Sequence, residues 1–283
     1  QAQDLDGTIL RKLGMPVGET PGLGPWRSFL DRRHKATKVI NVGLVGKYDL
    51  QDAYKSILEA LSQAGTYNDR KVKCHFINSE KINQNTVADM LKGMDGYVIC
   101  PGFGQRGIEG KIIAAQYCRE HNLPTFGICL GMQIAVIEFA RSVCGLADAN
   151  SGEFDEGSTH KVIDFMPDQS DEINKGGTLR LGAYPCCIVP GTKMAECYGT
   201  AEISERHRHR YEFNNNYRTL MQEKGLVLSG LSPDGHIVET IEIPENDFYI
   251  GVQYHPEFKS RPNKAHPLFK GLISAALRHT ERG

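Results

Sequence analysis

Short apolar runs alternate with stretches of helical periodicity along the first half of the chain. Four runs have the length of buried strands, at residues 38–45, 71–78, 96–100 and 124–128. Three segments between them space their apolar residues three and four positions apart, as amphipathic helices do, at residues 50–65, 107–122 and 131–145. This alternation predicts an α/β fold with an open, mostly parallel central sheet flanked by helices.

The second half of the chain and its first 36 residues show different sequence patterns. After about residue 150 the pattern changes to shorter strands and polar loops, so we expect a β-rich second half that closes with a helix at 267–279. Residues 1–36 combine a glycine- and proline-rich stretch with a charged run, which favours a linker, and the predicted domain is 37–283. The first residue is not methionine, so we expect a fragment of a longer protein.

Composition and charge narrow the partners. The 283 residues include 33 basic and 34 acidic side chains, and this near-neutral balance favours neither nucleic acid nor a membrane as partner. No apolar run approaches the roughly 18 residues that span a bilayer, and no signal peptide is evident, so we expect a cytoplasmic protein. The eight cysteines include no C-x-x-C pair, and we expect reduced thiols and no bound metal.

One cysteine lies where a predicted strand meets a predicted helix. In "GICLG" (127–131), Cys129 stands between Gly127 and Gly131. The G-x-C-x-G pattern is typical of a tight turn that presents a nucleophile, with glycines that leave room for crowded backbone and for substrate. A helix N-terminus also favours the thiolate over the thiol. Cys129 is therefore a candidate nucleophile, although the motif alone is only moderately specific.

A second segment offers a proton shuttle for such a thiol. In "GVQYHPEF" (251–258), His255 and Glu257 follow an apolar, strand-like run. At strand period two their side chains share a face, and we expect Pro256 to hold the chain extended so that the carboxylate orients the imidazole. Read alone, His-x-Glu fits a surface histidine beside a surface glutamate better. The candidate nucleophile is what favours the catalytic interpretation.

A glycine-rich stretch could supply an oxyanion hole. "CPGFGQRGIEG" (100–110) follows another predicted strand. The expected donors are the N–H groups of Gly102 and of Leu130, the residue after the candidate nucleophile. In isolation the stretch fits a simple strand-to-helix loop better.

These pieces together carry a resemblance. "PGFG", "GICLGMQ" and "YHPEF", in this order, resemble the Cys-His-Glu triad of the class I glutamine amidotransferases. Longer segments, including "DANSGEFD", "GGTLRLG" and "ERHRHRYEFNN", more narrowly resemble the C-terminal glutaminase domain of the CTP synthase family, from about residue 38 to 275. Residues 1–36 resemble the linker that leads from that family's synthase domain, which this sequence does not contain.

The resemblance implies a reaction and a binding site. Cys129 would attack the side-chain amide of L-glutamine, with His255 transferring protons and Glu257 orienting it. The glutamine-binding residues carried over by position are Gly102, Leu130, Gln133, Glu153 and Arg210. A guanidinium suits the substrate carboxylate, and a carboxylate suits its ammonium group.

It also implies partners beyond this domain, which itself would need no cofactor. In the complete enzyme, ammonia would pass to the synthase domain and aminate UTP activated by ATP and Mg, with homo-oligomers forming through that domain. GTP would be an allosteric activator of glutamine hydrolysis. "GGTLRLG" (176–182) matches a lid implicated in that response, and Arg180 is the residue carried over, with a solvated loop arginine as an equal alternative.

Two departures from the family pattern affect the expectations. Relatives usually read P-G-G-F-G where this chain has "CPGFG", beginning with Cys100 and Pro101. Proline lacks an N–H, but the expected donor belongs to Gly102, so the oxyanion hole should survive with a stiffer approach. Activity without an activator would be low if this loop must flip to present Gly102. Residues 164–175 are polar and acidic, and we expect a mobile loop of unknown role.

Three other interpretations remain open. The chain could be the glutaminase part of another amidotransferase, such as GMP synthetase, although "ERHRHRYE" and "GGTLRLG" argue against it. It could be a regulatory or assembly module without turnover, against which the intact Cys129, His255 and Glu257 weigh. The "ERHRHR" run alone would fit a basic nucleic-acid patch, for which so short a run is weak support.

Overall fold

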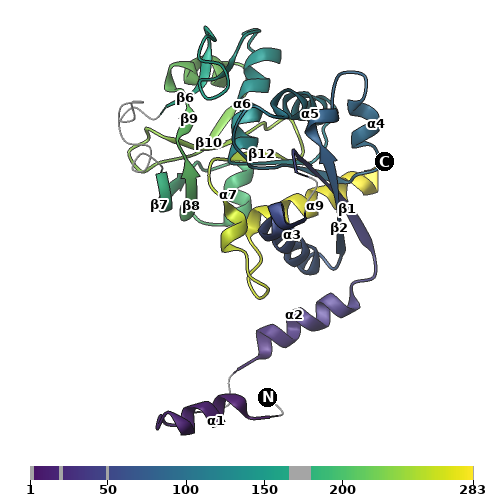
Figure 1. Cartoon of the computed structure of the whole chain (residues 1–283), viewed down its shortest axis with the longest axis vertical. Helices are drawn as coiled ribbons and strands as arrows, with labels where there is room; N and C mark the ends of the chain where they lie inside the picture. The colour runs from purple at the N-terminus through teal and green to yellow at the C-terminus, as the bar shows by residue number, and fades with distance from the viewer. Residues whose placement is uncertain (1–2, 19–21, 49–50, 166–179, 283) are drawn as a thin grey trace.

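The structure is a computed structural model that describes residues 3–18, 22–48, 51–165 and 180–282. In this part of the chain, nine strands form one sheet in the order β2-β1-β3-β4-β12-β11-β10-β7-β8 (Figure 1). Their bounds are β1 Val39–Gly46, β2 Lys71–Asn78, β3 Gly96–Ile99, β4 Thr125–Ile128, β7 Arg180–Ile188, β8 Glu202–His209, β10 Val227–Leu231, β11 Val238–Glu242 and β12 Tyr249–Val252. A second sheet of three short strands has the order β5-β6-β9, with β5 Asn150–Ser151, β6 Lys161–Phe165 and β9 Tyr211–Phe213.

The first five strands in this order, β2-β1-β3-β4-β12, run parallel to one another. β1 pairs with β2 and β3, and β4 pairs with β3. β12 lies beside β4 although Tyr249, where β12 begins, comes 124 residues after Thr125, where β4 begins. The remaining strands, β11, β10, β7 and β8, extend the sheet in antiparallel pairs. The predicted α/β class with a β-rich second half is therefore confirmed.

Helices cover both faces of the parallel part. α3 and α9 pack together on one face, and α5 and α6 pack together on the other (Figure 1). The strands supply apolar side chains to both layers, since Leu44 belongs to the core under α3 and α9 while the next residue, Val45, belongs to the core under α5 and α6. The α-helix bounds are α1 Leu5–Lys12, α2 Gly24–Lys35, α3 Lys55–Tyr67, α4 Val87–Leu91, α5 Ile108–Glu120, α6 Leu130–Ser142, α7 Lys193–Tyr198, α8 Arg218–Glu223 and α9 Pro267–Arg282.

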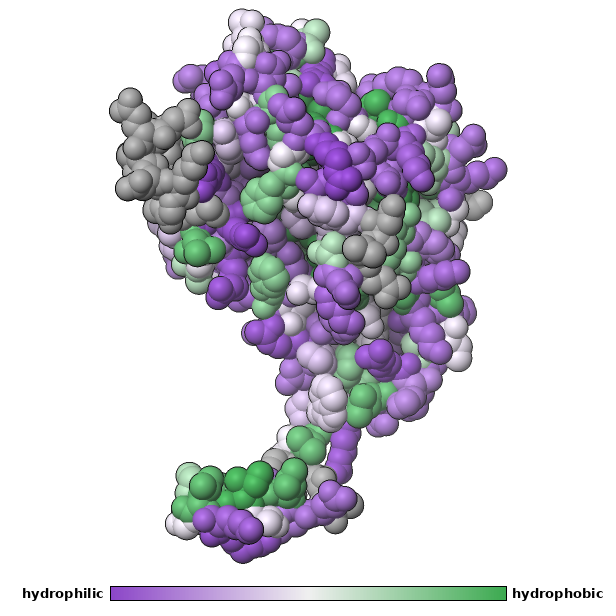
Figure 2. Space-filling view, in the orientation of Figure 1, coloured by the Kyte–Doolittle hydropathy of each residue, from purple (hydrophilic) through white to green (hydrophobic). Residues whose placement is uncertain are grey.

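The segment before β1 contains two helices, α1 and α2. Figure 1 shows them leading away from the body of the molecule, with α1 at the far end. Phe29 on α2 is buried, whereas α1 exposes the apolar side chains of Leu5 and Ile9, and Leu13 directly after α1 is also exposed. Figure 2 shows an apolar surface along this helix. Of the predicted loop 164–175, residues 164 and 165 end β6 and the others lie outside the described residues.

Candidate active site

Three predicted segments meet at one edge of the sheet. β3, β4 and β12 are parallel, so their carboxyl ends lie together, and the chain leaves them into the glycine-rich loop, Cys129 and the segment of His255. A cavity of about 410 Å³ lies at this edge. Its lining includes five of the predicted site residues, and the complete set is Gly102, Phe103, Cys129, Gln133, Glu153, Arg208, His209, Arg210 and Tyr211.

Cys129 is the residue on which the turn depends. It has φ 52° and ψ −104° and immediately precedes α6. A non-glycine residue with positive φ is strained, and such strain persists only where the surrounding structure imposes it. Here the Cys129 N–H donates to the Val252 carbonyl at 2.7 Å, while its carbonyl accepts the Met132 N–H at 3.0 Å. The turn is thereby tied to β12 on one side and to the first turn of α6 on the other.

The two glycines of the motif are required by close backbone contacts. A Cβ on Gly131 would lie 2.1 Å from the Ile99 carbonyl oxygen, and one on Gly127 would lie 2.7 Å from the Gly131 carbonyl. The helix therefore packs directly against β3 and β4, which only residues without a side chain permit. This packing is a more specific reason for G-x-C-x-G than general room for substrate.

His255 and Glu257 form a buried pair. The His255 Nδ1 and Glu257 Oε1 atoms are 2.8 Å apart, with side chains 10 % and 4 % exposed. Burial alone lowers the pKa of His255, but the Cys129 sulfur and Glu257 outweigh it and raise that pKa to about 10. No hydrogen bond within the described residues occupies His255 Nε2. The second ring nitrogen is therefore left for another group, and Cys129 is the neighbour that acts on this ring electrostatically.

The backbone between these two residues differs from the sequence expectation. β12 ends at Val252, and Pro256–Lys259 form a 3₁₀ turn, so the extended chain expected around Pro256 is wrong. The fixed φ of proline fits the first position of a helical turn as well as it fits a strand. The Glu257 side chain reaches back to His255 across this turn, and the pairing follows although its predicted cause does not.

The glycine-rich loop is held by two lysines. Lys111 is buried, and its Nζ donates to the Cys100 carbonyl at 2.7 Å. Burial lowers the pKa of Lys111 to about 8, with Lys47 also lowering it and Cys100 and Cys129 raising it. Lys47 Nζ donates to the Phe103 carbonyl. Sequence patterns missed both lysines, since neither belongs to a catalytic motif.

Three polar side chains, Gln133, Glu153 and Arg210, line the same cavity as Cys129, and we call them the polar wall. The Glu153 Oε1 accepts the Gly104 N–H at 3.0 Å, and burial raises the pKa of Glu153 while Gly104, Lys47 and Arg210 oppose that rise. The Gln133 Nε2 donates to the Tyr211 carbonyl at 2.9 Å. Leu130 is buried at the start of α6, directly after Cys129. The structure thus brings the predicted acidic, amide and guanidinium groups to one cavity.

Other cavity residues escaped the sequence reasoning. Phe103 is half exposed, and the Arg208 guanidinium lies 5.5 Å from the centre of its ring. The alternation of residues in "ERHRHR" could have revealed Arg208, because neighbouring side chains of a strand point to opposite faces. On β8, Arg208 is exposed and its neighbours His207 and His209 are buried. Arg208, His209 and Arg210 of this segment therefore line the cavity, whereas Arg206 lines a different pocket beside Lys259 and Arg261.

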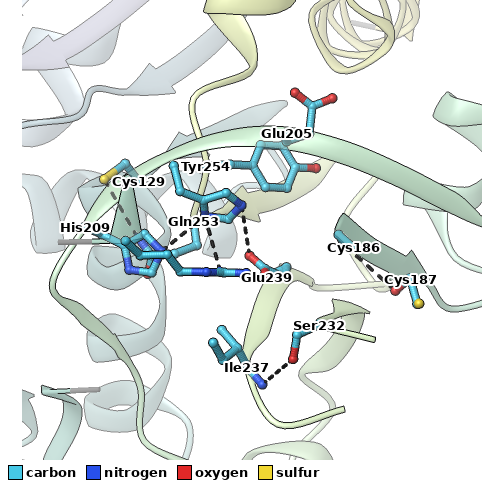
Figure 3. Close-up of polar contacts among 12 residues, drawn as sticks. Cys129, Cys186, Cys187, Glu205, His209, Ser232, Ile237, Glu239, Gln253 and Tyr254 are labelled. Atoms are coloured by element: carbon cyan, nitrogen blue, oxygen red, sulfur yellow. Dashed lines mark hydrogen bonds and ion pairs between the residues drawn. The ribbon is translucent and has the colours of Figure 1, made fainter. Parts of the chain in front are cut away.

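Arg180 lies in a buried cluster behind that edge. Its Nη1 is 2.6 Å from Glu239 Oε1, and the two side chains are 5 % and 0 % exposed, so Arg180 is not a solvated loop arginine. His207 Nδ1 contacts His209 Nε2 at 3.1 Å, and burial followed by the charge of Arg180 lowers the pKa of His209 to about 3. Figure 3 labels His209 and Glu239 of this cluster in the neighbourhood of Cys129, and His209 lines the same cavity as Cys129. The residues of "GGTLRLG" before Arg180 lie outside the described residues.

Within the described ranges there is no cluster of three or more His, Cys, Asp or Glu side chains that could hold a metal ion, and the cysteines are all free thiols. No helix of this part of the chain is both long and apolar enough to cross a membrane.

Comparisons with known proteins place this fold and cavity in a class. A model of the glutamine amidotransferase class-I family matches residues 49–275, so the chain belongs to the class I glutamine amidotransferases. A solved Trypanosoma brucei CTPS glutaminase domain with bound acivicin is 36 % identical, has a TM-score of 0.80, and is matched over 84 % of this chain and 94 % of its own. Within the class, the chain belongs to the glutaminase domains of the CTP synthase family.

Two further matches set the limits of this statement. A CTP synthase of Bacteroides thetaiotaomicron is 59 % identical over 98 % of this chain, but the chain spans only 52 % of that relative, about half its length. A putative GMP synthase subunit of Thermoplasma acidophilum has a TM-score of 0.57 at 15 % identity, with 87 % of this chain and 98 % of that one covered. At that identity the likeness supports the fold alone.

Proposed function

We propose that this domain hydrolyses L-glutamine to glutamate and ammonia through Cys129, His255 and Glu257. The observation that carries the proposal is the strained turn that presents Cys129 to the cavity, with the buried His255–Glu257 pair acting on its sulfur. A thiol on a strand-to-helix turn, an imidazole and an orienting carboxylate are the parts that acyl transfer requires.

The chemistry follows from the protonation of these groups. The Cys129 thiolate attacks the side-chain amide carbon of glutamine, and the Gly102 and Leu130 N–H groups stabilise the oxyanion. Protonated His255 gives its proton to the departing ammonia, which leaves a glutamyl thioester. His255 then takes a proton from water, the hydroxide attacks the thioester, and Cys129 is released with glutamate. Glu257 holds the imidazole and stabilises its cation throughout.

The polar wall supports glutamine as the substrate. Arg210 is the cation we assign to the α-carboxylate, and Glu153 the anion we assign to the α-ammonium group. Gln133 offers an amide to the same end of the substrate. The Trypanosoma brucei relative was solved with acivicin bound, which makes that compound a useful probe of the same cavity here.

The wider assignments rest on the family. We propose that the ammonia serves the amination of UTP to CTP by a synthase domain that uses ATP and Mg, in a cytoplasmic homo-oligomer, and that GTP activates hydrolysis with the help of Arg180. Residues 1–36 would link the two domains and 37–283 would form the glutaminase. Service to another amidotransferase, or an assembly role without turnover, are the alternatives that the experiment must separate.

Glutamate release from glutamine is the direct test. We would measure it with this chain alone and with the synthase domain attached, each with and without GTP, for the parent and for Cys129→Ala. We expect turnover in at least one condition and none in Cys129→Ala. Cys144→Ser changes a partly buried free cysteine in the bend after the far end of α6, and this control should keep its activity. Absence of turnover in all conditions would refute the enzyme, and turnover in Cys129→Ala would refute the nucleophile. UTP-dependent consumption of the ammonia separates CTP synthesis from the alternatives.

A further inference from the structure

Gln253 is a buried amide that the proposed mechanism does not use. It directly follows β12 and is 0 % exposed. Its backbone N–H donates to the Glu239 carbonyl at 2.8 Å, which fixes where the side chain starts. That side chain lies between Gln133 and the Cys129 sulfur, and Figure 3 shows it reaching toward the nucleophile.

A backbone carbonyl, which can only accept hydrogen bonds, determines how the two side-chain amides are oriented. The Tyr211 carbonyl accepts from Gln133 Nε2 at 2.9 Å, so the NH₂ end of Gln133 must face this way. The same Gln133 Nε2 donates to Gln253 Oε1 at 3.2 Å. The NH₂ end of Gln253 is then the end that faces sulfur, with Nε2 and Sγ 3.8 Å apart. The chain of contacts runs in one direction, from a backbone carbonyl to a donor aimed at the nucleophile.

A donor at this position favours the thiolate, because it stabilises negative charge on sulfur and cannot accept the S–H proton. Among the described residues, two charged groups couple to the sulfur, Lys111 and His255, and His255 is paired with Glu257. A positive charge on either group favours negative charge on sulfur. The Arg208 carbonyl lies 3.9 Å from Sγ and favours the thiol instead. Gln253 therefore opposes the effect of this carbonyl on the sulfur.

We propose that Gln253 is a positioning residue for this glutaminase reaction, which fixes the Gln133 amide in the substrate cavity and donates an N–H to the Cys129 thiolate. The proposal deepens the proposed function and rests on it for the substrate. One fully buried side chain would then connect glutamine binding with the state of the nucleophile. A substrate that shifts Gln133 would shift the donor at sulfur with it.

The test compares two replacements of nearly the same size. Gln253→Met removes both the donor and the acceptor, whereas Gln253→Glu keeps an acceptor for Gln133 and places an acceptor next to sulfur. Gln222→Met, an exposed amide on α8, is the matched control. The first measurement is the pH dependence of Cys129 alkylation by iodoacetamide without glutamine, with Cys129→Ala defining the reaction of the other cysteines. The second is KM against kcat for glutamine.

The contact from Gln253 to sulfur is long, so we assign it the lower end of the strength of hydrogen bonds to charged groups, about tenfold in thiolate fraction. We expect Gln253→Met to raise the alkylation midpoint by about one pH unit and also to raise KM. Gln253→Glu should raise the midpoint further while disturbing KM less, because Gln133 keeps its partner. The control should match the parent in both measurements.

Each outcome decides the matter. Thermal unfolding establishes that the variants are folded, and an unchanged midpoint in folded Gln253→Met overturns the proposal. If that variant does not fold, Gln253→Glu carries the test, and a midpoint equal to or below that of the parent overturns it. The alkylation assay does not depend on turnover, so it tests the role of Gln253 separately from the proposed glutaminase function. That function is tested by glutamate release, and release by Cys129→Ala would refute Cys129 as its nucleophile.

Discussion

Replacing Glu257 by glutamine tests how the imidazole is held. The change keeps the size of the side chain and an acceptor oxygen, but removes the negative charge that lies 2.8 Å from His255 Nδ1. Both side chains are buried, so water compensates little for the lost charge. The substitution therefore isolates the electrostatic part of this contact.

The size of the effect follows from the contact. A hydrogen bond to a charged group contributes about 1.5–3 kcal/mol, which corresponds to about 10- to 150-fold in rate where the charge develops in the transition state. The same energy shifts the pKa of His255 by about one to two units. From about 10 in the parent, we expect that pKa to fall to about 8 to 9 in Glu257→Gln.

The assay is glutamate release from about pH 6 to 11 under the condition that gives the parent turnover, alongside thermal unfolding at each pH. We expect kcat to decrease and the alkaline limb of the profile to move to lower pH. Because the folded-state pKa of His255 is raised above its ordinary value of 6.5, protonation stabilises the fold fully below pH 6.5, and this contribution is lost as the pH rises through about 10. In the variant the loss should begin at lower pH.

Glu223→Gln is the matched control, since Glu223 is exposed on α8. It should leave rate, alkaline limb and unfolding curve unchanged. A folded Glu257→Gln with the parent's rate and the parent's alkaline limb would refute the reasoning, because the carboxylate would then neither orient nor charge the imidazole.

Two further changes test the support of the site. Gly131→Ala places a Cβ 2.1 Å from the Ile99 carbonyl, so we expect it to cost about 1–3 kcal/mol or more in urea unfolding, whereas Gly18→Ala meets no atom within 4 Å and should be neutral. Lys111→Met leaves the Cys100 carbonyl without its donor, so kcat for glutamine should fall about tenfold or more with KM little changed. Lys35→Met, at an exposed position, is the control for Lys111→Met. An equal kcat in these two variants would argue that the contact between Lys111 and the glycine-rich loop does not affect catalysis.

The parallel half of the fold was predictable because its determinants are local. The strand predicted at 71–78 matches β2 Lys71–Asn78, and the helix predicted from residue 267 begins there as α9. Runs buried on both faces and amphipathic helices leave a periodic record in the sequence. The meeting of the three motifs was predictable for the same reason, because parallel strands bring their carboxyl ends to one edge.

The parts that were wrong or missed depend on contacts between distant segments. The fixed φ of Pro256 is compatible with both an extended strand and a 3₁₀ turn, and the packing of the segment after β12 decides which one forms. Lys111 reads as an exposed helix position in an amphipathic pattern, yet it is 1 % exposed because the Cys100 carbonyl provides a buried acceptor. No window of sequence contains both partners of such a contact.

The position of Arg180 changes what its predicted role in a GTP response would require. Its guanidinium is paired with Glu239 and stacked 4.4 Å from the Tyr184 ring centre, so direct contact with a phosphate would compete with a buried ion pair. Arg180 is instead paired in register with His209, which lines the cavity, across β7 and β8. A response that depends on Arg180 would therefore reach the cavity through this strand pair and its buried side chains, and the arginine would transmit the signal rather than bind the nucleotide.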